Sequence, residues 1–136
     1  PYRAKHIDAL EMVQRRGARF VMSDFRYTSS VTTMLSDLEW PSLADRRKIS
    51  RLVVFYKAVN NLVAIPLDSF TRRSRQTRSN PDNAISYTNL HANSNIFKYS
   101  FFPKTISDWN ALSATTRGIP TIDSFRSATA AELHSR

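Results

Sequence analysis

The chain has 136 residues, 41% of them hydrophobic, and its 20 lysines and arginines outnumber 11 acids, giving a formal net charge of +9. A chain of this length and composition is able to bury one core without disulfides or bound metals. It contains no cysteine and only two glycines, which excludes disulfide scaffolds, zinc knuckles, thiol catalysis and glycine-rich phosphate loops. No apolar run approaches the roughly 20 residues of a membrane span and no signal-peptide pattern opens the chain, so we expect an intracellular protein, cytoplasmic and nuclear, without membrane contact.

Apolar residues at helical spacing predict a helix over 4–22 and a second, shorter helix over 29–39. The apolar stripe of the first helix consists of Ile7, Leu10, Val13, Gly17, Phe20 and Val21. Its opposite side carries Arg15, Arg16 and Arg19. The second helix begins with serines, which are suited to capping the free N–H groups of a first turn.

The longest predicted helix begins near Ser42, the candidate N-cap, and Asp45, three residues on, forms a near capping box with it. Its buried face is expected to hold Ile49, Leu52, Val53, Tyr56, Val59 and Val63. Arg47 and Arg51 lie away from that face. The basic sides of this helix and of the first one fit phosphate contact and an ordinary solvent-exposed surface equally well.

Residues 67–97 are polar and have little helical periodicity. Their segment 71–78 holds four arginines, with no acid between Asp68 and Asp82. The four are Arg72, Arg73, Arg75 and Arg78. Because arginine forms two-pronged bonds with phosphate and stacks on bases, this loop favours nucleic acid as a partner. The alternative is a solvent-exposed linker that is repelled by its own charge.

Segments 84–90 and 96–102 are candidate strands of a short β-hairpin. Tyr87, Phe97 and Tyr99 lie within them. Exposed aromatics of this kind stack on bases in single-strand binding platforms. Their spacing here is more typical of core residues, so we do not assign them a stacking role.

Two helices are predicted near the C-terminus. Pro103 suits the first turn of one of them, where its missing N–H would be unpaired anyway, and Ile106 and Trp109 share a face of that helix. The last helix spans 121–134 and begins at Thr121. Its buried face is expected to hold Ile122, Phe125, Thr129 and Leu133, which would close the helical core.

The segment 99–112 reads Tyr-Ser-Phe-Phe-Pro-Lys-Thr-Ile-Ser-Asp-Trp-Asn-Ala-Leu. Four further blocks precede it, at 7–21, 29–35, 38–43 and 60–66, and a closing block follows at 119–126. In this order the blocks resemble the C-terminal, post-thumb tail of the reverse transcriptase polyprotein of non-LTR retrotransposons, LINE-type elements similar to jockey. The resemblance covers most of the chain and is weakest over 67–97.

The resemblance implies a position downstream of the polymerase palm and thumb, within a longer reading frame and apart from the endonuclease half of such elements. Polymerases of this kind need adjacent aspartates to hold two metal ions, and none of the eight aspartates has an aspartate neighbour. His6, His91 and His134 stand apart, without the spacing of metal ligands. We therefore expect no enzymatic activity, cofactor, metal or small-molecule substrate for this chain by itself.

These features predict a mainly α fold, one small domain over 1–136 with about five helices, an Arg-rich loop and a short β-hairpin. Its parts are helical residues 1–66, the loop and hairpin over 67–97, and C-terminal helices over 98–136. The predicted function is non-catalytic binding of template RNA or RNA/DNA beside the upstream reverse transcriptase domain. The residues expected to neutralise phosphate are Arg72, Arg73, Arg75 and Arg78, supported by Arg15, Arg16, Arg19, Arg47 and Arg51. The alternatives are a protein-interaction or structural module that braces the polymerase thumb, or a decayed remnant.

Overall fold

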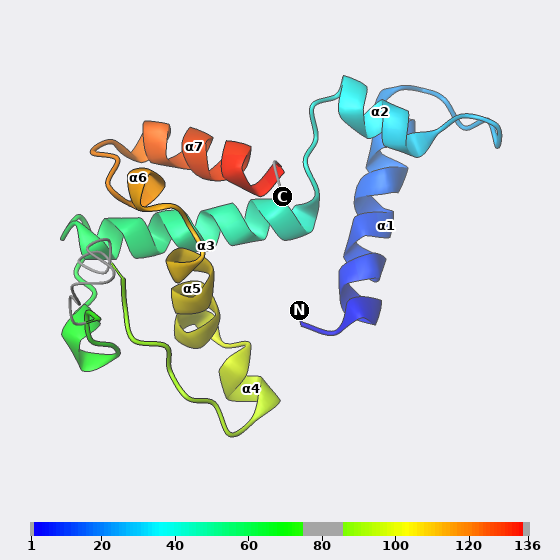
Figure 1. Ribbon diagram of the computed structural model, residues 1–136. Coiled ribbons are helices and arrows are strands. Elements are labelled where there is room, and N and C mark those ends of the chain that lie inside the picture. Colours follow the sequence, from blue (N-terminus) through cyan, green and yellow to red (C-terminus); the bar gives the residue numbers. More distant parts are fainter. Residues whose placement is uncertain (1, 75–85, 135–136) are drawn as a thin grey trace. The chain divides into compact units, whose positions relative to one another are not determined.

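The computed structural model describes residues 2–74 and 86–134 and confirms the mainly helical class (Figure 1). The elements are α1 (Ala4–Val21), α2 (Val31–Asp37), α3 (Leu43–Val59), the 3-10 helix η1 (Leu67–Ser69), α4 (Asn95–Lys98), α5 (Phe101–Asn110), α6 (Ala114–Arg117) and α7 (Ile122–His134). The chain divides into two compact units, unit 1 over 1–47 and unit 2 over 48–136, and α3 begins in the first and continues in the second. The single domain expected over the whole chain stays a prediction.

Unit 1 has a small buried face. Gln14 and Ala18 of α1 are buried, together with Met34 of α2. The apolar stripe of α1 does not form that face, since Val13 is 62% and Phe20 75% exposed. Instead the amide Nε2 of Gln14 donates a hydrogen bond of 3.0 Å to the backbone carbonyl of Pro41, which precedes α3. The helix was predicted correctly, but its inward side is set by this polar contact and not by the most apolar residues.

The start of α3 is held by polar groups of unit 1. The Glu11 carboxylate accepts hydrogen bonds from the N–H groups of Leu43 and Ala44, at 3.2 and 3.0 Å. Ser42 Oγ accepts from the N–H of Asp45 at 3.0 Å and donates to its carboxylate at 2.6 Å. The predicted capping pair is therefore confirmed, and Glu11 adds a negative charge at the helix end that favours it.

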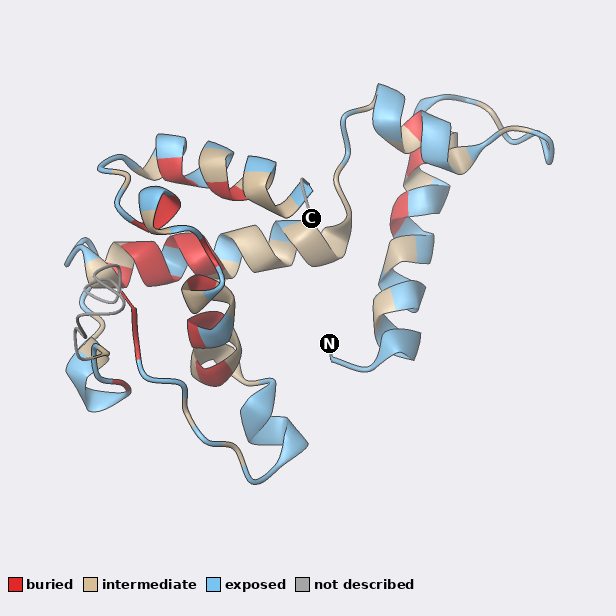
Figure 2. Cartoon of the chain, viewed as in Figure 1, coloured by how far each residue is buried: buried red, intermediate tan, exposed pale blue. Residues whose placement is uncertain are grey.

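Unit 2 is built on aromatic rings from three helices. Phe55 of α3 contacts Trp109 of α5 with ring centroids 5.2 Å apart, and Tyr56 of α3 stacks on Phe125 of α7 at 4.5 Å. Helix α7 runs alongside α3, and α5 leads away from it (Figure 1). The buried residues of this unit gather where the three helices meet (Figure 2). The predicted burial of Phe125 is confirmed, and Ile106 and Trp109, predicted to share a face, are also 0% exposed.

Asn110 ties the segment that follows the Arg-rich loop to α5. Its Oδ1 accepts from the N–H of Tyr87 at 3.0 Å, and its Nδ2 donates to the Tyr87 carbonyl at 2.7 Å. Tyr87 is buried, with its ring 5.2 Å from that of Phe55. The neighbouring Trp109 and Asn110 thus have complementary structural roles, because the indole fills the core while the amide pairs with an otherwise unpaired backbone.

The predicted β-hairpin is wrong. Its second candidate strand forms α4 and the first residues of α5. Ser94 Oγ accepts from the Phe97 N–H at 3.3 Å and caps α4, and α5 begins directly after Ser100, ahead of Pro103. The aromatic-rich run favoured a strand here, but the Ser94 side chain satisfies a first-turn N–H group and favours a helix start instead.

Candidate nucleic-acid interface

Seven of the nine arginines predicted to bind nucleic acid lie within the described residues, whereas Arg75 and Arg78 lie outside them. The seven occupy different surroundings. Arg15, Arg16 and Arg19 are on α1, Arg47 and Arg51 are on α3, and Arg72 and Arg73 begin the Arg-rich segment. Arg47 belongs to unit 1 and Arg51 to unit 2, so the predicted set does not form one patch within one unit.

Residues 71–74, which begin the Arg-rich segment, pair with residues 86–88 in a short neck. Two backbone hydrogen bonds of 2.9 Å join the two sides, and an antiparallel bridge pairs Arg73 with Tyr87. The side chains of Arg72 and Arg73 are exposed and form no hydrogen bond or ion pair with the rest of the described chain. Their backbone is therefore fixed while their guanidinium groups are presented to solvent.

A buried guanidinium contributes to this neck. Arg117, the last residue of α6, is 9% exposed, and its Nη1 donates to the hydroxyl of Ser86 at 2.5 Å. Its Nε has no hydrogen-bond partner, and Arg117 takes part in none of the ion pairs between described residues. A buried cation without a carboxylate is costly to maintain, and no acid among the described residues forms an ion pair with Arg117. No sequence pattern marked Arg117, because a helix of four residues has no periodicity to read.

The arginines of α1 divide into two kinds. Arg15 and Arg16 are exposed and make no hydrogen bond or ion pair among the described residues. Arg19 is half-buried, and its guanidinium donates to three backbone carbonyls of the following loop, at 3.4, 2.9 and 3.4 Å. Arg19 thus braces the α1–α2 loop, which leaves Arg15 and Arg16 as the phosphate-accessible pair of this helix.

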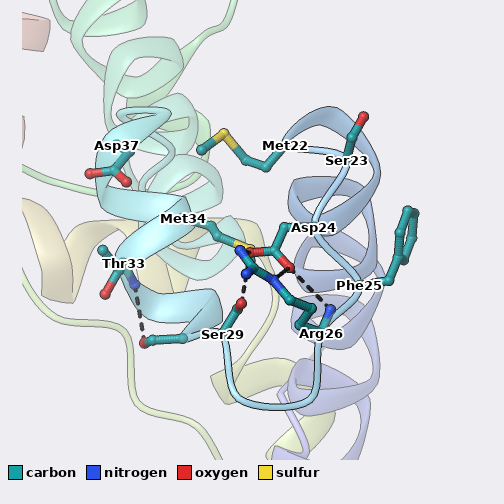
Figure 3. A pocket seen from close by; sticks show the side chains of 10 residues that line it. Met22, Ser23, Asp24, Phe25, Arg26, Ser29, Thr33, Met34 and Asp37 are labelled. Atoms are coloured by element: carbon teal, nitrogen blue, oxygen red, sulfur yellow. Dashed lines mark hydrogen bonds and ion pairs between the residues drawn. The ribbon is translucent and has the colours of Figure 1, made fainter.

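An open hollow of about 810 Å³ lies beside that loop (Figure 3). Met22, Phe25 and Met34 are among its lining residues. Arg26 donates two hydrogen bonds to the Asp24 carboxylate at 3.1 and 3.3 Å, and with the Ser29 hydroxyl it holds the pKa of Asp24 well below its usual range. Asp24 in turn raises the pKa of the Arg26 guanidinium. The hollow therefore combines adaptable thioether side chains with a fixed ion pair, a surface suited to packing more than to chemistry.

The arginines of α3 are more enclosed. Arg51 Nη2 lies 2.7 Å from the Asp108 carboxylate of α5, and Lys48 Nζ lies 3.3 Å from its other oxygen. Arg51 thereby links α3 to α5 within unit 2. Arg47 is half-buried and forms no ion pair among the described residues. Unlike Arg47, Arg51 therefore has a carboxylate partner, Asp108, which a phosphate would have to displace.

A basic hollow of about 260 Å³ is lined by α4, α5 and residues of the segment 89–92 that precedes them. Lys98 Nζ and Lys104 Nζ lie 5.7 and 5.8 Å from the centroid of the Tyr99 ring. Tyr99 is 40% exposed, and Asp108 is the acid in the lining. These lysines were not predicted as site residues, because they are separated in sequence and meet only when α4 is helical.

The chain matches no family model, no curated protein and no solved structure. No helix among the described residues is long and apolar enough to cross a bilayer. Within residues 2–74 and 86–134, no group of three or more histidines or acids is arranged to hold a metal ion. The basic features of the described residues are the neck of unit 2, the exposed Arg15 and Arg16 on α1, and the hollow at Tyr99.

Proposed function

We propose that this chain is a non-catalytic nucleic-acid-binding module whose main contact is the Arg-rich segment of unit 2. The observation that carries the proposal is the neck: Arg72 and Arg73 have a fixed backbone and exposed guanidinium groups, and Arg117 adds a buried charge beside them. Fixing the backbone lowers the ordering entropy lost when a phosphate binds. Arg75 and Arg78 extend the same segment in sequence and are assigned the same role.

The chemistry proposed is neutralisation of backbone phosphates, which positions a strand without reading its bases. Arg15 and Arg16 are secondary contacts, since they are exposed on α1 and have no partner among the described residues. The resemblance to the tail of LINE-type polyproteins supports a more specific version. In that version the module holds template RNA, or the RNA–DNA junction, beside a reverse transcriptase domain encoded upstream.

Fluorescence anisotropy of labelled single-stranded RNA across a salt series tests this proposal. The key variant changes Arg72, Arg73, Arg75 and Arg78 to glutamine. Its charge-matched control changes Arg3, Lys5, Arg46 and Arg126 to glutamine, four cations that are exposed elsewhere. About four phosphate contacts correspond to a log–log salt slope near −3 for a single strand, and we expect the loop variant alone to lose most of that slope. Equal losses in the two variants would show that net charge, and not the loop, determines binding.

A second candidate function is docking to a protein through α1, as expected for a module that braces the polymerase thumb. The observation that favours it is the exposed apolar stripe, in which Leu10 is 39%, Val13 62% and Phe20 75% exposed. Apolar residues gathered on one side of a helix usually mark an interaction surface. This function predicts weak RNA binding that is unaffected by the loop variant, and tighter association with the upstream domain that is lost when Val13 and Phe20 are changed to serine.

A further inference from the structure

The basic hollow at Tyr99 is lined by an aromatic ring and apolar side chains as well as by lysines, and phosphate neutralisation requires only the lysines. Tyr99 presents a partly exposed ring, and Leu90 and Pro103 add apolar surface to the lining. Ser107 and Asp108 contribute polar groups. Its volume of about 260 Å³ falls just below the roughly 300 Å³ at which pockets for drug-sized ligands begin, so it suits one planar group such as a nucleobase.

The charge of the hollow favours an anionic ligand. Lys98 and Lys104 both line it, with their ammonium groups close to the Tyr99 ring. Asp108 is the acid of the lining, and its carboxylate is already paired with Lys48 and Arg51. Two lysines and one acid therefore line the hollow, and that acid is also paired with two cations outside the lining.

We propose that this hollow receives one unpaired nucleotide of single-stranded nucleic acid. Its base stacks on Tyr99, and Lys98 and Lys104 move from the ring to the phosphates on either side. One base–aromatic stack and two ammonium–phosphate contacts together replace the two ammonium–aromatic contacts that are given up. The inference rests on the proposed function, because the same strand is bound by the Arg-rich segment, but different side chains carry it. It adds a preference for single strands, since a duplex does not offer an unstacked base.

The test compares a single-stranded DNA oligonucleotide with an abasic oligonucleotide of the same length, which has the same phosphates and no bases. We expect Tyr99→Leu to weaken binding of the base-bearing strand about tenfold and to leave the abasic strand unchanged, because stacking on one base is lost. Tyr99→Trp should retain binding of both strands. Changing Lys98 and Lys104 to glutamine should weaken both strands alike and reduce the salt slope by roughly 1.4.

Several outcomes would overturn the inference. An equal effect of Tyr99→Leu on both strands, or no effect on either, would exclude base stacking at this hollow. Tighter binding of an acidic peptide than of the base-bearing strand would reassign the hollow to a protein ligand. Circular dichroism shows whether Tyr99→Leu folds. If it does not, the variant with glutamine at positions 98 and 104 decides, and unchanged binding of both strands by that variant would overturn the inference. Salt-dependent binding by the wild type that is lost in the loop variant, with no effect at Tyr99, would overturn this inference while leaving the proposed function in place.

Discussion

The two units of this chain bury different kinds of side chain. Unit 2 encloses a set of aromatic rings at its centre, with Trp109 and Phe125 fully shielded from water. Unit 1 encloses one amide and two small or flexible apolar residues, Gln14, Ala18 and Met34, and leaves larger ones such as Phe20 outside. Apolar burial is the dominant favourable term in folding, so unit 2 has the stronger source of stability.

The difference bears on how each unit can take part in binding. A well-packed unit holds its surface groups in place, and the neck of the Arg-rich segment is tied to the core of unit 2 through Tyr87 and Asn110. Unit 1 depends on hydrogen bonds that Glu11 accepts and that Gln14 and Arg19 donate, whose net contributions are individually small. Its exposed apolar stripe is better suited to packing against a partner than to positioning a phosphate.

The largest effect on stability is expected from replacing Trp109. Trp109→Ala should lower the free energy of unfolding by about 3–5 kcal/mol, because it removes the fully buried ring that joins α3, α5 and α7. Trp40→Ala is the matched control in unit 1, where the ring is 37% exposed and should cost much less. Urea denaturation followed by circular dichroism measures both. Equal losses would contradict the contrast drawn between the two units.

A smaller effect is expected when the tie between core and neck is cut. Asn110→Ala leaves the N–H and carbonyl of Tyr87 without their partners and should cost about 1–3 kcal/mol. Amide hydrogen exchange should become faster at Tyr87 and Thr88, since the neck loses its attachment to α5. Asn93→Ala, at an exposed position, is the control and should leave both quantities unchanged. Unchanged exchange in the Asn110 variant would mean that the neck does not depend on this amide.

Unit 1 should respond to the loss of a single helix cap. Glu11→Ala removes the carboxylate that accepts from the Leu43 and Ala44 N–H groups and should destabilise the start of α3 by about 1 kcal/mol. Asp8→Ala changes the same charge one helical turn earlier, at an exposed site. Chemical denaturation of the two variants provides the comparison. A larger loss from Asp8 would contradict the capping role of Glu11.

The smallest effect concerns pH. Because the folded-state pKa of Asp24 is lowered, its ion pair stabilises the α1–α2 loop fully above the unfolded-state pKa of about 3.9 and loses that contribution as the pH falls further. The difference in unfolding free energy between wild type and Asp24→Asn should therefore be constant from about pH 8 to about pH 5 and shrink below about pH 4. A difference that changed near neutral pH would point to another group.

Features that depend on neighbouring residues were predicted well. The shared face of Ile106 and Trp109, the inward Phe125 and the Ser42–Asp45 cap follow from helical spacing and from a local hydrogen bond. The hairpin failed for a local reason as well, since the Ser94 side chain caps a helix start where the aromatic-rich run indicated a strand.

Features that depend on distant residues could not be predicted. Arg51 pairs with an acid 57 residues away, and Arg117 with a hydroxyl 31 residues away, so neither role is visible in the local sequence. Arg19 has the same appearance in sequence as Arg15 and Arg16 and differs only because a loop folds back onto it. The basic hollow at Tyr99 escaped prediction because its two lysines come together only when α4 forms.

The most direct test of nucleic-acid binding by unit 2 is an NMR titration of the full chain with single-stranded RNA, following every assigned backbone amide. We expect the largest chemical-shift changes at the neck, residues 71–74 and 86–88, and around Tyr99, with smaller changes at Arg15 and Arg16. Shifts confined to the exposed apolar stripe of α1, or their absence at the neck when RNA is in excess, would contradict the proposed function and favour the protein-docking role.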